Sequence, residues 1–188
     1  GSFPPATTYD ANGKPMHSWR VLILPQLGYP DLYAQYDFDL SWDSVENSPL
    51  AYAMPMEYAS AVDPAAIGNG EPSFNVITGN GSAFPTKGWR KRTEIRGAWA
   101  DTVLVAETIS YGFSWLEPRD FRLARLEPQV NGSAGQSFAS HSPRGPQVLP
   151  PAGDVHTLRL DAPAPAITAM APIVRAAPLF AHAAPTAH

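Results

Sequence analysis

Acidic side chains gather most densely between the first and second quarters of the chain, and clusters of carboxylates are what calcium prefers as ligands. Asp37, Asp39 and Asp43 lie in one short stretch, and Glu46 follows them. Hard carboxylate oxygens suit Ca²⁺, so the stretch suggests a calcium site formed by the three aspartates. Its spacing differs from the D-x-D-x-D-G pattern of an EF-hand loop. The alternative is that these carboxylates are solvated or cap turns beside buried aromatic residues.

A second group of carboxylates could do acid–base chemistry. Glu107, Glu117 and Asp120 could supply the carboxylate pair that glycoside hydrolysis requires. Glu107 ends an apolar segment, so its carboxylate is expected to be buried. A buried carboxylate must be hydrogen-bonded, and the alternative is that Glu107 accepts backbone N–H or arginine hydrogen bonds inside the fold. No further catalytic motif supports the hydrolase hypothesis.

Histidine offers two more possibilities. His141 and His156 are fifteen residues apart and could bind a metal together across a hairpin, although no third ligand has the spacing of a known site. The alternative for His141 is a structural hydrogen bond to a turn. A Ser-His-Asp triad has its residue types present, but the sequence lacks the G-x-S-x-G nucleophile motif.

Exposed aromatic residues could bind a partner. Trp89 precedes the basic residues 90–92, and this patch could contact sugar or phosphate groups. Trp89, Trp99 and Trp115 could each serve as a stacking platform for a saccharide. The alternative at Trp89 is a solvated basic loop with one tryptophan packed on the protein.

Composition narrows the class of protein. Lys and Arg total 13 against 17 Asp and Glu, which gives a net charge of -4 and makes nucleic acid an unexpected partner. No run of apolar residues is long enough to span a membrane. Cysteine is absent, which excludes disulfides and thiolate chemistry. With 21 Pro and 14 Gly, the chain favours short strands and long loops over a helical bundle.

Four segments are predicted to form strands. Residues 102–108 carry a continuous apolar run, which is typical of a central strand that is covered on both faces. Residues 73–78 alternate as a strand and end at a Gly-Asn-Gly turn. Residues 147–149 and 155–160 are predicted to pair as a hairpin.

Helices are expected to be short. Ser18 can cap a helix that begins at Trp19, and Pro30 suits the first turn of another. Residues 51–72 are predicted to be irregular, and residues 110–115 are predicted to be extended.

The last 28 residues differ in composition from the rest. Residues 161–188 contain 11 Ala and 5 Pro and only two charged side chains, and they are predicted to form an extended tail with no helix longer than a few residues. Such a tail can be disordered, or it can dock on a neighbouring molecule. Its apolar residues, and with Trp89 the predicted interaction residues, are Ile173, Val174, Leu179 and Phe180.

Several ordered blocks of the sequence resemble one known family. The blocks are Gly1–Ala6, Asp10–Pro15, His17–Arg20, Tyr36–Asp39, Trp42–Ser44, Thr102–Glu107 and Trp115–Asp120. Their order is similar to that of domain-of-unknown-function family 1559, exported pseudopilin-like proteins that are abundant in planctomycetes and carry a His-x9-Asp-Gly motif. The resemblance covers residues 1 to about 160, which implies a globular domain at 1–160 followed by the tail at 161–188.

The resemblance implies a fold and a location. The expected fold is α+β: a small antiparallel sheet with short helices and long loops, like the globular head of a pilin. Family members carry a prepilin-type helix before the Phe-Pro-Pro segment, so its absence here implies cleavage or truncation. The motif expected at His141 to Asp154 also departs from the pattern, because it has one added residue and ends Gly-Asp.

The leading functional hypothesis is a non-enzymatic structural protein at the cell surface or outside the cell. Such a protein, similar to the pseudopilins of type II secretion, would assemble with other copies of itself into filaments. The alternative is a module that binds cell-surface polysaccharide, and a glycoside hydrolase comes third. No cofactor other than calcium is expected.

Overall fold

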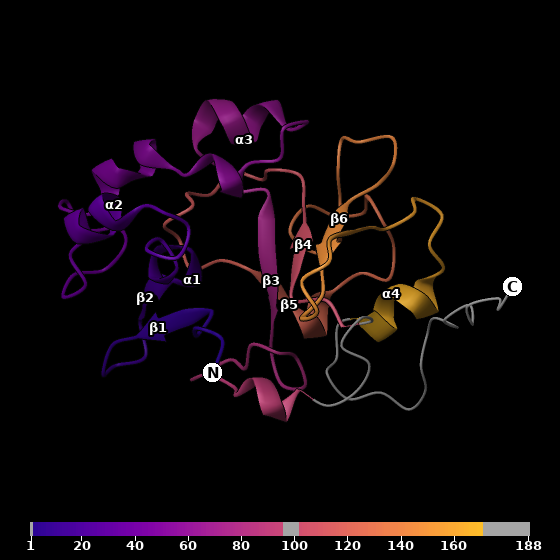
Figure 1. Ribbon diagram of the computed structural model, residues 1–188, viewed down its shortest axis with the longest axis horizontal. Coiled ribbons are helices and arrows are strands. Elements are labelled where there is room, and N and C mark those ends of the chain that lie inside the picture. Colours follow the sequence, from indigo (N-terminus) through magenta and orange to yellow (C-terminus); the bar gives the residue numbers. More distant parts are fainter. Residues whose placement is uncertain (1, 96–101, 171–188) are drawn as a thin grey trace, which may run out of the picture.

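A five-stranded sheet organises the fold (Figure 1). A computed structural model describes residues 2–95 and 102–170 of the 188-residue chain. The sheet order is β5-β3-β4-β6-β7. The strands are β3 (Phe74–Thr78), β4 (Val105–Glu107), β5 (Phe121–Arg122), β6 (Gln147–Leu149) and β7 (His156–Thr157).

The predicted strands and their pairing are confirmed, with shorter bounds. β4 is central and runs antiparallel to both β3 and β6, and β6 pairs antiparallel with β7. Only β5 departs from the antiparallel pattern, because it runs parallel to β3. The α+β class with a small, mainly antiparallel sheet is therefore confirmed.

The sheet is covered on both faces, as the apolar run of the central strand predicted. Val76 of β3 packs into one hydrophobic core while Ile77, the next residue, packs into the other. Val105 and Ala106 divide in the same way, as expected from the two-residue period of a strand. Burial on both faces lets short strands persist in a loop-rich chain.

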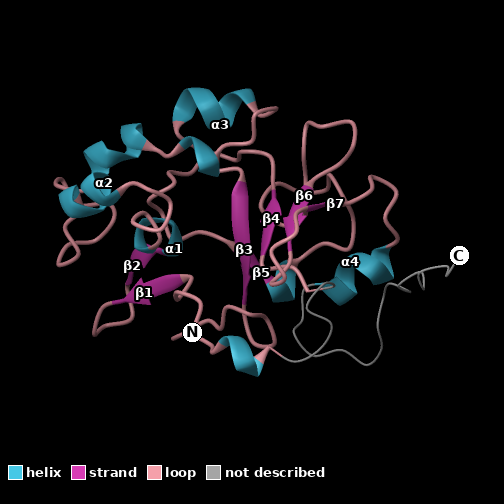
Figure 2. Cartoon of the chain, in the orientation of Figure 1, coloured by secondary structure: helices cyan, strands magenta, loops and turns pink. Residues whose placement is uncertain are grey.

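A separate hairpin and two short helices form the N-terminal part of the chain (Figure 2). β1 (Thr7–Tyr9) pairs antiparallel with β2 (Pro15–Ser18) around a turn at Gly13, whose φ of 82° suits glycine. α1 (Trp19–Leu22) follows directly, and its first turn is capped by the Ser18 side chain, as predicted. α2 (Pro30–Gln35) begins with proline, also as predicted.

The region predicted to be irregular is mostly helical turns, so that prediction was wrong. It contains the 3₁₀ turns η1 (Ser48–Ala53) and η2 (Met56–Tyr58) and the helix α3 (Pro64–Asn69). Asp63 caps α3 and Gly70 ends it in the left-handed conformation. Both signals are present in the sequence. Residues 110–115, predicted to be extended, form no strand.

The start of the predicted tail is also helical. Residues Ala164–Met170 form α4, where extended chain was predicted. Pro165 lies in the first turn, where its missing N–H costs no hydrogen bond. Ile167 and Met170 are buried in the second core, and the Met170 carbonyl accepts a hydrogen bond from Val103 N. Packing on the sheet therefore stabilises a helix that its proline content argued against.

The packing of α4 can be tested at Ile167, which is fully buried. Ile167→Ala should lower the free energy of unfolding by about 2–4 kcal/mol, because it removes buried methylene groups and leaves a cavity. The matched control is Thr168→Ala on the exposed side of the same helix, which should change it by less than about 0.5 kcal/mol. Urea unfolding of both variants measures this. Equal effects would show that α4 does not pack on the core.

Candidate functional site

Two of the three predicted calcium ligands, Asp37 and Asp43, have local partners for their carboxylates. The Asp37 side chain accepts a hydrogen bond from Asp39 N, and Asp43 accepts one from the Ser41 hydroxyl and lies 3.7 Å from Lys14. The Ser41 hydrogen bond is the largest contribution that lowers the pKa of Asp43. Across residues 2–95 and 102–170, no group of three or more His, Asp or Glu side chains is placed to hold a metal ion. The calcium hypothesis thus gains no support from the geometry.

Glu107 holds together segments that are distant in sequence. Its Oε1 accepts hydrogen bonds from the hydroxyls of Ser60 and Ser140, both at 2.7 Å, and its Oε2 accepts one from Gln147 N at 2.8 Å. The residue is 3% exposed. This agrees with the structural alternative proposed from the sequence, in which a buried carboxylate takes backbone hydrogen bonds. Glu117 instead pairs at 2.6 Å with Arg119 at the surface.

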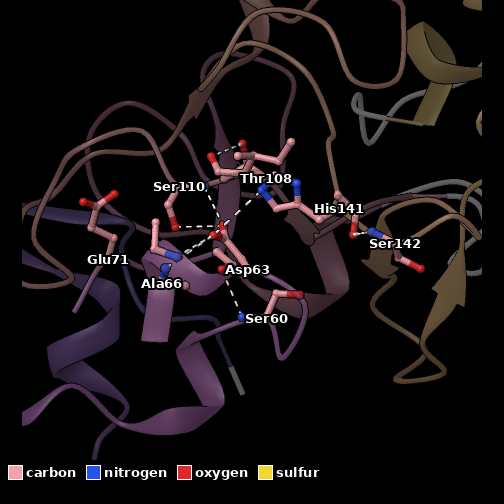
Figure 3. Close-up of polar contacts among 12 residues, drawn as sticks. Ser60, Asp63, Ala66, Glu71, Thr108, Ser110, His141 and Ser142 are labelled. Atoms are coloured by element: carbon pink, nitrogen blue, oxygen red, sulfur yellow. Dashed lines mark hydrogen bonds and ion pairs between the residues drawn. The ribbon is translucent and has the colours of Figure 1, made fainter. Parts of the chain in front are cut away.

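Asp63 forms a second buried carboxylate centre (Figure 3). Its Oδ2 accepts hydrogen bonds from the backbone and the hydroxyl of Ser110, and its Oδ1 accepts them from Ala65 N and Ala66 N at the start of α3. Burial alone would raise the pKa of Asp63, but these donors outweigh it and lower the pKa. Asp63 therefore fixes α3 against the loop after β4.

His141 lies against this centre. Its Nε2 is 4.0 Å from Asp63 Oδ1, and Figure 3 shows its ring directed toward that carboxylate. The imidazole is about half exposed, so it reaches solvent while facing a buried anion. His156 lies on the edge strand β7 with its side chain exposed. The contact of His141 is thus with a side chain that caps a helix, and the predicted pairing of the two histidines gains no support.

The third centre is a buried ion pair between two of the blocks that carry the family resemblance, His17–Arg20 and Trp115–Asp120. Arg20 of α1 and Asp120 lie 3.2 Å apart, with side-chain exposures of 0% and 2%. Asp120 Oδ1 also accepts hydrogen bonds from Trp19 Nε1 and from Val76 N of β3. Arg20 donates in addition to the Phe74 carbonyl at 2.7 Å. One carboxylate oxygen therefore joins α1, the central part of the sheet and the loop before β5.

Some atoms of this pair lack a partner. Asp120 Oδ2 and Arg20 Nε are buried and make no hydrogen bond with the described part of the chain, residues 2–95 and 102–170. Burial raises the pKa of Asp120 to about 6, and the nearby Arg20 charge and the hydrogen bonds only partly offset this. The carboxyl is therefore protonated far more easily than an exposed aspartate.

A cleft of about 900 Å³ is lined in part by Asp120, one member of this ion pair. It is bounded by β1, by the turn that follows β3, and by residues 117–124. Glu117 and Asp120 line it, whereas Glu107 does not. The structure therefore places only two of the three carboxylates proposed for hydrolysis at one cleft, and both of these are already paired with arginine.

The predicted aromatic sites separate into three cases. Trp89 is 56% exposed, so its role as a contact residue stays a prediction. Trp115 is fully buried and donates a hydrogen bond to the Ala51 carbonyl at 3.2 Å, so its proposed role as a stacking platform was wrong. Trp99 and the tail residues Ile173, Val174, Leu179 and Phe180 lie outside the described residues.

The sequence interpretation missed Asp63 and Arg20. Asp63 had a local signal, because Asp-Pro before a short apolar segment is typical of a capped helix. Arg20 had a weaker one: a lone cation inside the apolar run from Trp19 to Leu24, which implies a buried anionic partner. Its identity as Asp120, one hundred residues away, has no local signal.

The ion pair predicts a specific pH dependence of stability. The folded-state pKa of Asp120, about 6, is above the unfolded value near 3.9, so the folded protein binds this proton more tightly. Its contribution to stability is full below about pH 4 and is lost as the pH rises through about 6, a change of up to about 3 kcal/mol.

Urea unfolding of the unsubstituted chain and Asp120→Asn between pH 4 and 7.5 checks this. The difference between their unfolding free energies should change over this window, which cancels the opposing contribution of His17, whose pKa burial lowers. Parallel pH profiles would contradict the assignment.

Glu107 and Glu117 provide a matched pair of substitutions. Glu107→Gln should destabilise the fold by about 2–3 kcal/mol, because an amide NH₂ would face donors that now bind a carboxylate. Glu117→Gln should cost less than about 1 kcal/mol, because the Arg119 pair is at the surface. Thermal unfolding of both variants measures this, and a neutral Glu107→Gln would mean that the carboxylate does not hold the segments together.

Comparison with known proteins supports the family resemblance. The family described as "Protein of unknown function (DUF1559)" matches residues 1–122 of the 188. No curated protein and no solved structure matches the chain. The matched region contains both partners of the buried ion pair, Arg20 and Asp120, and the strand that ends in Glu107. The chain is thus a member of the DUF1559 family of proteins of unknown function.

Proposed function

We propose that this protein is a non-enzymatic structural subunit that associates with copies of itself at the cell surface, in the manner of a pilin or pseudopilin. The observation that carries the proposal is a concentration of exposed apolar side chains on one segment. Five large ones lie within residues 45–67, and they are Val45, Tyr52, Met56, Val62 and Ile67. Exposed apolar residues gathered in this way mark contact surfaces.

This segment, which we call the apolar end, is held as one unit. Gly70 at the end of α3 lies so close to η1 that a Cβ there would be 2.9 Å from the Ala51 carbonyl. Tyr29, just before α2, donates a hydrogen bond to Glu57 in η2 at 2.9 Å. Tyr52 is 97% exposed although it sits in this ordered region, so its ring is available to a partner.

The partner that fits best is a second copy of the chain. Figure 1 shows α2 and the turns after it at one end of the longest axis and α4 at the other. The sequence after α4 supplies further apolar residues, at 173–174 and 179–180. Exposed apolar side chains on residues 45–67 and an apolar segment after α4 in the sequence suit contact between copies. A head-to-tail contact of this kind extends into a filament when its rotation does not close a ring.

The buried carboxylates support a structural role over a catalytic one. Glu107 and Asp63 are both nearly fully buried and accept hydrogen bonds that link distant segments. Asp120 is buried against Arg20. These acids therefore hold distant segments of the chain together, which suits a structural subunit. We do not retain the hydrolase hypothesis.

Substitutions at both ends test the assembly. Tyr52→Asp and Ile67→Asp should abolish higher-order species, because each places a charge in the proposed apolar contact. Leu179→Asp with Phe180→Asp should do the same from the other side. Light scattering after size-exclusion chromatography and negative-stain microscopy measure this.

The matched control is Val155→Asp, an apolar residue that is 61% exposed outside the apolar end. It should assemble like the unsubstituted chain. A chain that stays monomeric at all concentrations would disprove self-assembly. Assembly that survives the Tyr52 and Ile67 substitutions would show that another surface carries it.

A further inference from the structure

The cleft lined in part by Asp120 has the size and construction of a ligand site. Its volume of about 900 Å³ is within the range of small-molecule sites. Its three walls come from β1, from the turn after β3 and from residues 117–124, so distant segments converge on it. The proposed assembly does not use this surface.

The walls are held in place before any ligand arrives. The buried Ser82 hydroxyl lies 2.9 Å from the Gly79 carbonyl and 2.8 Å from the Phe84 carbonyl, which fixes the turn after β3. Asp120 ties the opposite wall to Trp19. The N-terminal wall is linked to the same region, because Trp19 N donates to the Ala6 carbonyl at 2.9 Å. Such rigid walls reduce the entropy cost of binding.

The lining favours a ligand rich in hydroxyl groups. Thr7, Tyr9, Thr78, Asn80 and Thr86 line the cleft from two different walls, and their side chains carry hydroxyls and one amide. The Thr78 hydroxyl already donates to the Phe121 carbonyl at 2.8 Å, so it is left as an acceptor. The other groups both donate and accept hydrogen bonds, which matches the hydroxyls of a sugar. Prolines in the lining and the Tyr9 ring add apolar surface for the C–H faces of a pyranose.

One positive charge in the cleft is uncompensated. Asp120 is neutralised by Arg20 and Glu117 by Arg119. Arg122 also lines the cleft, and it makes no ion pair with any residue in the described ranges 2–95 and 102–170. Its position is set by the pairing of β5 with β3, where Arg122 lies opposite Thr78. A planar guanidinium of this kind recognises a carboxylate through two parallel hydrogen bonds.

We propose that this cleft binds an acidic oligosaccharide, with a uronic acid carboxylate on Arg122 and sugar hydroxyls on the threonines and Asn80. The net charge of -4 opposes a polyanion elsewhere on the protein, so an acidic ligand would be directed to the cleft by the local charge of Arg122. A subunit with this site would attach to acidic polysaccharide at the cell surface. The inference is independent of self-assembly.

Calorimetric titration of the full chain with oligogalacturonate, and with a neutral gluco-oligosaccharide of equal length, tests the proposal. Oligogalacturonate should bind at least tenfold more tightly than the neutral sugar. Arg122→Gln should reduce its affinity at least tenfold, and Asn80→Ala should reduce it several-fold. Both positions are exposed, so both variants should fold normally, and circular dichroism checks this.

The matched control is Arg125→Gln, which removes an exposed cation three residues away that does not line the cleft. It should leave the affinity unchanged. The proposal is overturned if oligogalacturonate does not bind at millimolar concentration or if the neutral sugar binds equally well. It is also overturned if Arg125→Gln weakens binding as much as Arg122→Gln, since the attraction would then be diffuse, or if acetate alone competes at the same concentration.

Discussion

The fold depends on an ion pair that has almost no contact with water. Arg20 and Asp120 are one hundred residues apart, yet their side chains are 0% and 2% exposed. Burying two charges costs several kcal/mol each, so such a pair is tolerated only when both members are closely matched and hydrogen-bonded. Here hydrogen bonds from Trp19 and Val76 to the same carboxylate oxygen further stabilise the buried Asp120 carboxylate. Any packing of α1, β3 and the loop before β5 that kept both side chains buried but apart would leave two unpaired charges out of water.

The same principle recurs at two further acids. Glu107 receives donors from three segments, and Asp63 joins α3 to the loop after β4. Because the chain has many loops, hydrogen bonds to buried carboxylates hold segments in place that longer strands and helices would otherwise position.

Local signals predicted the elements better than they predicted the site. The central strand could be predicted because its continuous apolar run is a local feature of the sequence. The helix starts could be predicted because the Ser18 cap and Pro30 act within one turn. The predictions for residues 51–72 and for the segment that forms α4 were both wrong, for two different reasons. The capping signals of Asp63 and Gly70 were present but not used, whereas α4 depends on the burial of Ile167 and Met170 against the sheet, which no local pattern contains. Of the proposed site residues, Glu107 was correctly expected to be buried and hydrogen-bonded, but the serines that bind it come from elsewhere in the chain.

The sequence by itself determined the class of fold, the central strand, the short capped helices and the family, because each of these is encoded in neighbouring residues or in an ordered set of blocks. The tertiary structure alone decided that Arg20 meets Asp120 and that Trp115 is buried. It also placed Arg122 at a cleft, with no ion-pair partner among the residues that the structure describes. Electrostatic and packing partners are chosen by distance in space, and a chain that turns so often brings together residues whose separation in sequence carries no information about their contact.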